Sequence, residues 1–181
     1  MRVVGGKARG HKLYAPDGLS TRPTTDRVKE SIFNMIDNYV YNSNFLDLYS
    51  GTGGIGIEAL SRGAKKCTFV DTHTKDIIIK NLDHVKKALG DYEVHLCEES
   101  VNNAINNFYN NNEKFDIIFM DPPYKKELNV KTVKQIREQN ILSQNGILIV
   151  EQSIDLLKNN KINFNKLKDV AEKNILNTFQ L

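Results

Sequence analysis

The chain has 181 residues, of which 40% are hydrophobic and 26% charged, so it is long enough to bury a sheet between two helical layers without disulfides or metals. No apolar run approaches the roughly 20 residues that span a bilayer, and the first residues lack the apolar segment of a signal peptide, so we expect a cytoplasmic protein. The net charge of +3 is too small to indicate nucleic-acid binding by itself.

The chain opens with a short predicted hairpin that is rich in basic residues. Residues 2–4 and 12–15 have the composition of two short strands, and Pro16 ends the second. Apolar residues then recur at helical spacing over residues 24–39. We expect residues 1–23 to form a basic extension and residues 24–181 to form the main domain. The bases of the first thirty residues are Arg2, Lys7, Arg9, His11, Lys12, Arg22, Arg27 and Lys29.

After the first helix, short β-rich segments alternate with amphipathic helical segments. The predicted strands are residues 45–49, 67–71, 92–97, 115–120 and 146–151, and the predicted helices are residues 55–62, 74–89, 100–109 and 130–139. Because helices separate the strands, we expect parallel pairing with right-handed crossovers, which is a doubly wound α/β sheet. Residues 166–173 and 174–181 give a weak signal for a final pair of strands at the sheet edge. Cys67 and Cys97 fall within strands, and we expect both to be reduced core residues.

A glycine-rich turn joins the first predicted strand to the helix that follows it. Gly51, Gly53 and Gly56 let the backbone turn tightly and let a ligand approach peptide groups at a helix N-terminus. Their spacing also satisfies the dinucleotide fingerprint, and Asp71 stands where such folds place an acid on the ribose. The glycine pattern alone is therefore ambiguous between a nicotinamide dinucleotide and S-adenosylmethionine.

The charge of Asp47 distinguishes these two ligands. Asp47 lies at the carboxyl end of its strand, where a pyrophosphate would be repelled by roughly 4 kcal/mol per charge pair at an effective dielectric of about 20. S-adenosylmethionine carries an ammonium and a sulfonium and no phosphate, so the carboxylate attracts it. We predict S-adenosylmethionine as the cofactor, with Asp47 at its methionine end and Asp71 at the ribose hydroxyls. Its remaining close contacts are predicted to come from Tyr49, Ser50, Gly51 and Gly53. The alternative is that Asp47 only caps a helix or pairs with an arginine.

The motif Asp121-Pro122-Pro123-Tyr124 follows the predicted strand over residues 115–120. This strand should neighbour the first strand, which places Asp121 beside the cofactor at the switch point of the sheet. The lone pair of a base amino group is delocalised into the ring, so the nitrogen needs hydrogen-bond acceptors that draw the pair back. The Asp121 carboxylate and the Pro122 carbonyl supply acceptors, and Tyr124 offers a stacking face worth about 1 to 3 kcal/mol. We predict these three residues as catalytic; the alternative is an ordinary proline turn.

These strings together resemble the bacterial small-subunit ribosomal RNA guanine-N2 methyltransferases of the RsmD type. The resemblance is carried by Arg2-Val-Val-Gly-Gly, Arg22-Pro-Thr-Thr-Asp-Arg-Val-Lys-Glu, the glycine turn and Asp121-Pro-Pro-Tyr, and it spans almost the whole chain. It implies a class I methyltransferase with a Rossmann-like, mostly parallel sheet that methylates guanine N2 in 16S ribosomal RNA, within a 30S particle or an assembly intermediate. It also implies an RNA clamp formed by Arg9, Lys12, Arg22 and Arg27, and it places Glu99 at the adenine. We expect a monomer and no metal site.

The chain departs from the family pattern at two places. Asp71 stands where relatives usually have glutamate, and Lys173-Asn-Ile-Leu replaces a Lys-x-Tyr-Gly pattern in the tail. Two other functions stay open. One is an adenine-N6 methyltransferase of DNA or RNA, which uses a similar Asp/Asn-Pro-Pro-Tyr loop, and the other is a non-catalytic RNA-binding assembly factor that keeps the fold.

Overall fold

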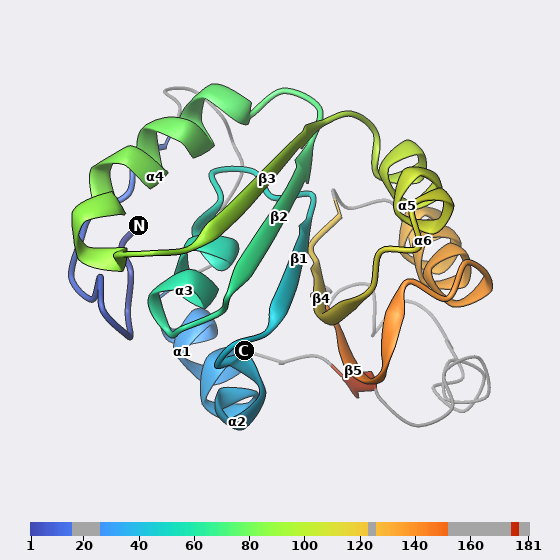
Figure 1. Ribbon diagram of the computed structural model, residues 1–181, viewed down its shortest axis with the longest axis horizontal. Coiled ribbons are helices and arrows are strands. Elements are labelled where there is room, and N and C mark those ends of the chain that lie inside the picture. The colour runs from blue at the N-terminus through green and yellow to red at the C-terminus, as the bar shows by residue number, and fades with distance from the viewer. Residues whose placement is uncertain (16–25, 123–125, 152–174, 178–181) are drawn as a thin grey trace.

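The structure is a computed structural model that describes residues 1–15, 26–122, 126–151 and 175–177. Within these residues the strands form one six-stranded sheet in the order β3-β2-β1-β4-β5-β6, and every neighbouring pair is parallel (Figure 1). The strand order reverses between β1 (Asn44–Leu48) and β4 (Phe115–Met120), which lie side by side. This confirms the predicted doubly wound α/β fold and the predicted neighbour of the fourth strand.

Helices and strands alternate along the chain as the hydrophobic pattern predicts. The other strands are β2 (Lys66–Asp71), β3 (Glu93–Glu98), β5 (Leu142–Val150) and β6 (Ile175–Asn177). The helices are α1 (Asp26–Met35), α2 (Asp37–Val40), α3 (Gly54–Ser61), α4 (Lys75–Leu89), α5 (Val101–Asn110) and α6 (Lys126–Glu138). In the part of the chain that the structure describes, no helix is both long enough and apolar enough to cross a membrane.

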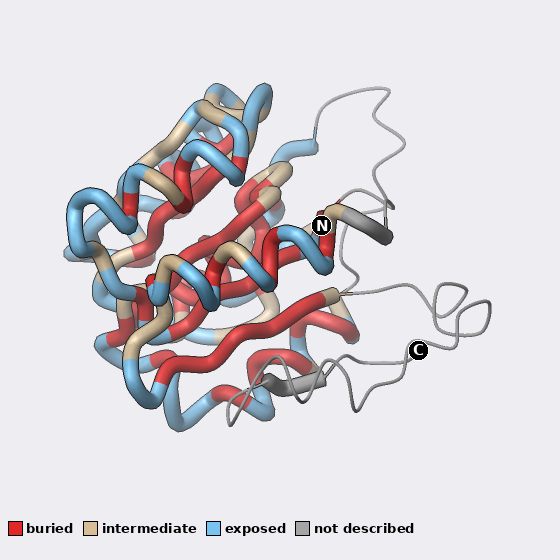
Figure 2. Tube along the Cα trace, turned by 90° about the vertical axis from the view of Figure 1, so that its right-hand side faces the viewer, coloured by how far each residue is buried: buried red, intermediate tan, exposed pale blue. Residues whose placement is uncertain are grey.

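Two hydrophobic cores fill the space on the two faces of the sheet. Alternate residues of a strand point to opposite faces, so Phe45 enters one core and Leu46 and Leu48 enter the other. α1, α3 and α4 cover the first core, and α5 and α6 cover the second (Figure 1). Figure 2 shows the buried segments concentrated in the interior and the exposed segments on the outer turns of the helices. Burial on both faces explains why β1, β2 and β4 read as nearly continuous apolar runs.

The predicted N-terminal hairpin forms only a single antiparallel bridge, between Arg2 and Lys12. The Val3 N–H donates to the His11 carbonyl at 2.9 Å, and the Leu13 N–H donates to the Met1 carbonyl at 3.0 Å. We call the described residues 1–15 the N-terminal arm. Its apolar side chains Val3, Ala8 and Leu13 are buried in the core beneath α1, α3 and α4, so the N-terminal arm packs as part of the main body.

Several element boundaries differ from the sequence prediction. The helix predicted over residues 24–39 is interrupted at Ile36, which separates α1 from α2. α6 begins at Lys126 rather than at residue 130, and β5 begins at Leu142 rather than at residue 146. The polar residues at the start of β5 hid its first half, because they interrupt the apolar run. Of the predicted final pair of strands, β6 is present beside β5, and residues 166–173 lie outside the described residues.

Candidate functional site

Three carboxylates converge at the carboxyl edge of the sheet. Asp47 lies near the end of β1, Asp71 ends β2, and Asp121 follows β4 directly. Because β1 lies between β2 and β4, strand pairing brings these distant residues together. Burial raises the pKa of Asp47 well above its usual range, and the negative charges of Asp121 and Asp71 raise this pKa further. Burial and neighbouring charge thus disfavour the charged form of Asp47, and a cationic ligand that restores the carboxylate is favoured at this edge.

Asp47 is buried under the glycine turn, with only 1% of its surface exposed. Its Oδ2 atom accepts a hydrogen bond from the Gly56 N–H, in the first turn of α3, at 2.9 Å. This is the helix-capping contact that the sequence left open as an alternative. One carboxylate oxygen thus holds the start of α3 in place, and the role of Asp47 toward a cofactor stays a prediction.

The glycine turn has one crowded side and one open side. A Cβ atom added at Gly56 would lie 2.2 Å from Phe69 Cε1 and 2.6 Å from Cys67 Sγ, so glycine is required for α3 to pack on β2. Gly51 has a φ of 52°, and a Cβ atom added there would meet nothing within 4 Å. The backbone at Gly51 is therefore accessible to a ligand, whereas Gly56 serves packing.

Hydrogen bonds from Ser50 and Asp71 fix the shape of this turn. The Asp71 carboxylate accepts from the Gly51 N–H and from the His73 N–H, both at 3.0 Å. The Ser50 hydroxyl donates to the Asp47 carbonyl at 2.6 Å and accepts from the Val70 N–H at 2.9 Å. Ser50 is buried, and its hydroxyl links the end of β1 to β2 instead of facing the open side of the glycine turn.

Tyr49 and Glu99 have hydrogen-bond partners on the face covered by α5 and α6. Tyr49 has a φ of 61°, so it belongs to the turn rather than to the strand where the sequence placed it. Its hydroxyl lies 3.0 Å from the Thr132 hydroxyl of α6, and partial burial raises the pKa of Tyr49. The Glu99 carboxylate accepts from the Asn107 amide at 3.1 and 3.2 Å. Both residues therefore lie at the sheet edge with their polar atoms engaged.

Asp121 retains an exposed surface at the end of β4. The surrounding protein nevertheless removes part of its hydration, and this desolvation raises the pKa of its carboxyl to about 6. Pro122 is buried beside it. Among the predicted RNA-binding residues, Arg9, Lys12 and Arg27 are exposed. Two predicted residues, Tyr124 and Arg22, lie outside the described residues.

A residue that the sequence analysis missed connects the N-terminal arm to the glycine turn. Asn81 of α4 is fully buried. Its amide accepts from the Tyr14 N–H at 2.6 Å and donates to the Tyr14 carbonyl at 3.0 Å and to the Thr52 carbonyl at 2.9 Å. The sequence carried a signal for it, because Asn81 falls on the apolar stripe of α4 with Ile78 and Leu82.

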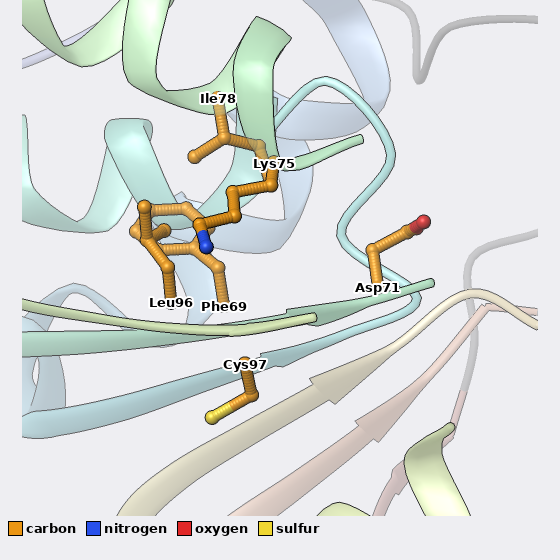
Figure 3. A pocket seen from close by; sticks show the side chains of 6 residues that line it. All are labelled: Phe69, Asp71, Lys75, Ile78, Leu96 and Cys97. Carbon is orange, nitrogen blue, oxygen red and sulfur yellow. The ribbon is translucent and has the colours of Figure 1, made fainter. Parts of the chain in front are cut away.

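A small hollow lies beside Asp71, where β2 and β3 meet α4. Its volume of about 10 Å³ is room for about one water molecule. Figure 3 shows Phe69, Ile78 and Leu96 on one side of the sheet, with Cys97 pointing to the other side. The residues that line it are Phe69, Asp71, Lys75, Ile78, Leu96 and Cys97. Both cysteines are free, and Cys67 is buried in the core as predicted. Cys97 is only partly buried and packs against the second core, because it lies near the end of β3, an edge strand of the sheet.

Residues 1–179 match the family model described as conserved hypothetical protein 95. The chain belongs to this family. YlbH of Bacillus subtilis is 40% identical over 156 residues, which are 83% of this chain and 82% of YlbH. Ribosomal RNA small subunit methyltransferase D of Haemophilus influenzae is 36% identical over 160 residues, which are 86% of this chain and 80% of that protein. The solved structure of YhhF from Escherichia coli has a TM-score of 0.70 at 30% identity and covers 83% of this chain and 79% of its own. The predicted family and the predicted methyltransferase fold are confirmed.

Proposed function

We propose that the chain transfers a methyl group from S-adenosylmethionine to the exocyclic N2 of a guanine in small-subunit ribosomal RNA. The observation that carries this proposal is the convergence of Asp47, Asp71 and Asp121 at the switch point of the sheet. This negative edge attracts an ammonium and a sulfonium and repels a pyrophosphate. A family member that is 36% identical is named Ribosomal RNA small subunit methyltransferase D, and this supports the same kind of RNA as the substrate.

The residues around the glycine turn fit this cofactor. The open side at Gly51 lets a ligand reach the backbone, and Asp71 stands next to it with a carboxylate suited to sugar hydroxyls. The apolar side chains of Phe69, Ile78 and Leu96 form a wall beside Asp71 against which a ring can pack. Asp47 supplies negative charge from below the turn. We assign the methionine end to Asp47 and the ribose to Asp71.

Asp121 and Pro122 prepare the base for methyl transfer. When bound, S-adenosylmethionine supplies an electrophilic methyl carbon on a positively charged sulfur. The Asp121 carboxylate and the Pro122 carbonyl accept hydrogen bonds from the amino group, which orients it and returns electron density to its nitrogen. The nitrogen–carbon bond forms as the carbon–sulfur bond breaks, and the surplus proton leaves the nitrogen through the Asp121 carboxylate to water. Tyr124 is assigned to stacking on the base.

The N-terminal arm is assigned to the surrounding RNA. A base within a helix must be flipped out before it reaches Asp121, so contacts to neighbouring phosphates must hold the RNA in place. Arg9, Lys12 and Arg27 are exposed, and we assign this role to them together with Arg22. The substrate is proposed to be the RNA within a 30S particle or an assembly intermediate, and the enzyme a cytoplasmic monomer.

Transfer of labelled methyl groups tests this function. Wild-type protein is incubated with labelled S-adenosylmethionine and with small-subunit ribosomal RNA, 30S particles or duplex DNA, and the modified nucleoside is identified by mass. We expect N2-methylguanosine, and we expect no product with Asp121→Ala, which removes the hydrogen-bond acceptor. N6-methyladenosine as the product would instead support the adenine-N6 activity, and binding of RNA without any transfer would support the assembly-factor alternative.

A further inference from the structure

Aromatic and basic side chains from the N-terminal arm and from α4 gather on one exposed surface. The Lys80 ammonium lies 4.1 Å from the centroid of the Tyr14 ring, and the His84 ring packs edge-on against Tyr14 at 5.4 Å. The centroid of the His11 ring lies 6.0 Å from that of His84. Tyr14 is 43% exposed, and Lys80 and His84 are exposed as well. A lysine held over an aromatic ring is ordered in advance, so it loses less freedom when it binds an anion.

The N-terminal arm runs antiparallel to α4 along this surface. Tyr14 is hydrogen-bonded to Asn81, and the Lys7 ammonium donates to the Leu89 carbonyl at the far end of the helix at 3.4 Å. From Asn81 to Leu89 a helix rises about 12 Å. Lys80, His84 and Lys87 are spaced by four and three residues, so they lie on one face of α4. We call the surface formed by His11, Tyr14, Lys80, His84 and Lys87 the arm–α4 strip.

The lysines of the arm–α4 strip are available to a ligand. Neither Lys80 nor Lys87 forms an ion pair with any residue that the structure describes. The exposed acids of α4 are Asp76 and Asp83. Asp76 lies four residues before Lys80, and Asp83 lies four residues before Lys87, so both acids border the strip. The strip itself contains two lysines and no acid, and the Lys80 ammonium is held over the Tyr14 ring rather than paired with a carboxylate.

We propose that the arm–α4 strip binds the phosphates of the substrate RNA next to the methylated base, in addition to the arginine and lysine contacts assigned above. This inference rests on the proposed function, because RNA is the substrate there. The strip begins at the carboxyl edge of the sheet, because Asn81 is hydrogen-bonded both to Tyr14 and to Thr52 of the glycine turn. Cations spaced along about 12 Å match a polyanion better than a single small anion. RNA that leaves the site past the glycine turn therefore meets Lys80 first and Lys87 last.

The salt dependence of RNA binding tests the strip. Lys80→Gln/Lys87→Gln is compared with Lys114→Gln/Lys134→Gln, which removes the same charge from exposed lysines outside the strip. The probe is a transcript of small-subunit ribosomal RNA. We expect the strip variant to bind roughly tenfold more weakly at about 0.1 M salt, with the slope of log K against log salt smaller by about 1.5. The control variant should bind like wild type, and both variants should keep wild-type affinity for S-adenosylhomocysteine.

The possible outcomes distinguish failure of the strip from failure of the proposed function. Equal affinities and equal salt slopes for the two variants overturn the strip, even where methylation proceeds normally and the proposed function stands. A reduced slope in the strip variant supports the strip even if wild-type protein transfers no methyl group, in which case only the proposed function fails. Wild-type protein that binds neither the transcript nor 30S particles overturns both the strip and the proposed function.

Discussion

Asp121 is the residue whose protonation should control the reaction. Its carboxyl has a pKa of about 6 because the surrounding protein removes part of its hydration. Only the charged carboxylate accepts a hydrogen bond from the amino group without competition from its own proton. We therefore expect the single-turnover rate of methyl transfer to rise with pH around a midpoint near 6 and to level off above it. A rate that is flat between about pH 5 and about pH 7 would contradict this role.

Asp121 should also limit the stability of the ligand-free protein. Its pKa in the folded protein, about 6, lies above the ordinary value of 3.8, so folding favours the protonated form. The resulting stabilisation is complete below the ordinary pKa and is lost as the pH rises through about 6. Asp121→Asn should therefore melt at a higher temperature than wild type above this range, with the gap closing at acid pH. Thermal melting across the pH series measures this, and a less stable variant at neutral pH would contradict it.

Asp47 has two candidate roles, attraction of the cofactor by its charge and capping of α3, and one substitution separates them. Asp47→Asn keeps an oxygen that can accept from the Gly56 N–H but removes the negative charge. We expect S-adenosylhomocysteine to bind at least about tenfold more weakly, which corresponds to about 1.4 kcal/mol. The free energy of unfolding should be maintained or raised, because a buried charge is costly. Calorimetry and urea unfolding measure the two quantities. Unchanged cofactor affinity would leave Asp47 as a helix cap alone.

The sequence predicted where the three acids lie but did not predict the hydrogen bonds around them. Each acid ends or follows an apolar run, so its place at the carboxyl edge could be predicted from the strand pattern. The contacts of Ser50 and Asn81 could not, because their partners Val70 and Tyr14 become neighbours only when β2 and the N-terminal arm have packed. A polar residue on an apolar helix stripe indicates a buried hydrogen bond without indicating its partner.

Two glycines of the same turn should respond differently to alanine. In Gly56→Ala the new methyl group would lie 2.2 Å from Phe69 Cε1, and we expect a loss of about 1 to 3 kcal/mol in the free energy of unfolding. Gly51→Ala meets open space, so it should lose only about 1 kcal/mol for its positive φ. Its methyl group projects into the space where we propose that the cofactor binds, so cofactor affinity should fall. Urea unfolding and calorimetry on both variants measure this contrast, and equal stability losses would contradict it.

Elements were predicted well where both faces are buried and less well where polar residues begin them. β4 was predicted at its observed bounds, because all but one of its residues are buried. β5 begins with a half-exposed polar stretch, and its pairing with β4 shifts register between Phe115 and Ile117. No periodic signal marks such a shift. The interruption at Ile36 was also hidden, because apolar spacing continues across it.

A buried charge network joins the N-terminal arm to two helices. Lys29 of α1 and Glu58 of α3 have no exposed side-chain surface, and their charged atoms lie 3.9 Å apart. Glu58 also accepts from the Val4 N–H at 2.8 Å and from Arg62 Nε at 2.9 Å. The Lys29 ammonium donates to the Arg2 carbonyl. The network thus fixes the position of the N-terminal arm relative to the glycine turn, after which α3 begins.

Lys29→Met should destabilise the whole molecule. The substitution leaves Glu58 buried with one cation fewer, and breaking a buried pair in this way costs about 3 to 5 kcal/mol. We expect a lower urea midpoint and faster cleavage of the N-terminal arm by protease. Lys65→Met, at an exposed lysine, serves as the control and should behave like wild type. A Lys29 variant with wild-type stability would contradict the proposed importance of this network.

The N-terminal arm has partners that the ribosome synthesises much later. Val4 and Ala8 are held by Glu58 and Ser61, Tyr14 by Asn81, and Lys7 by Leu89. During translation, the opening segment therefore emerges long before its binding surface exists, and it cannot dock until about half of the polypeptide has left the exit tunnel. Its apolar side chains stay uncovered throughout that interval, so the nascent chain presents a ready target for chaperones.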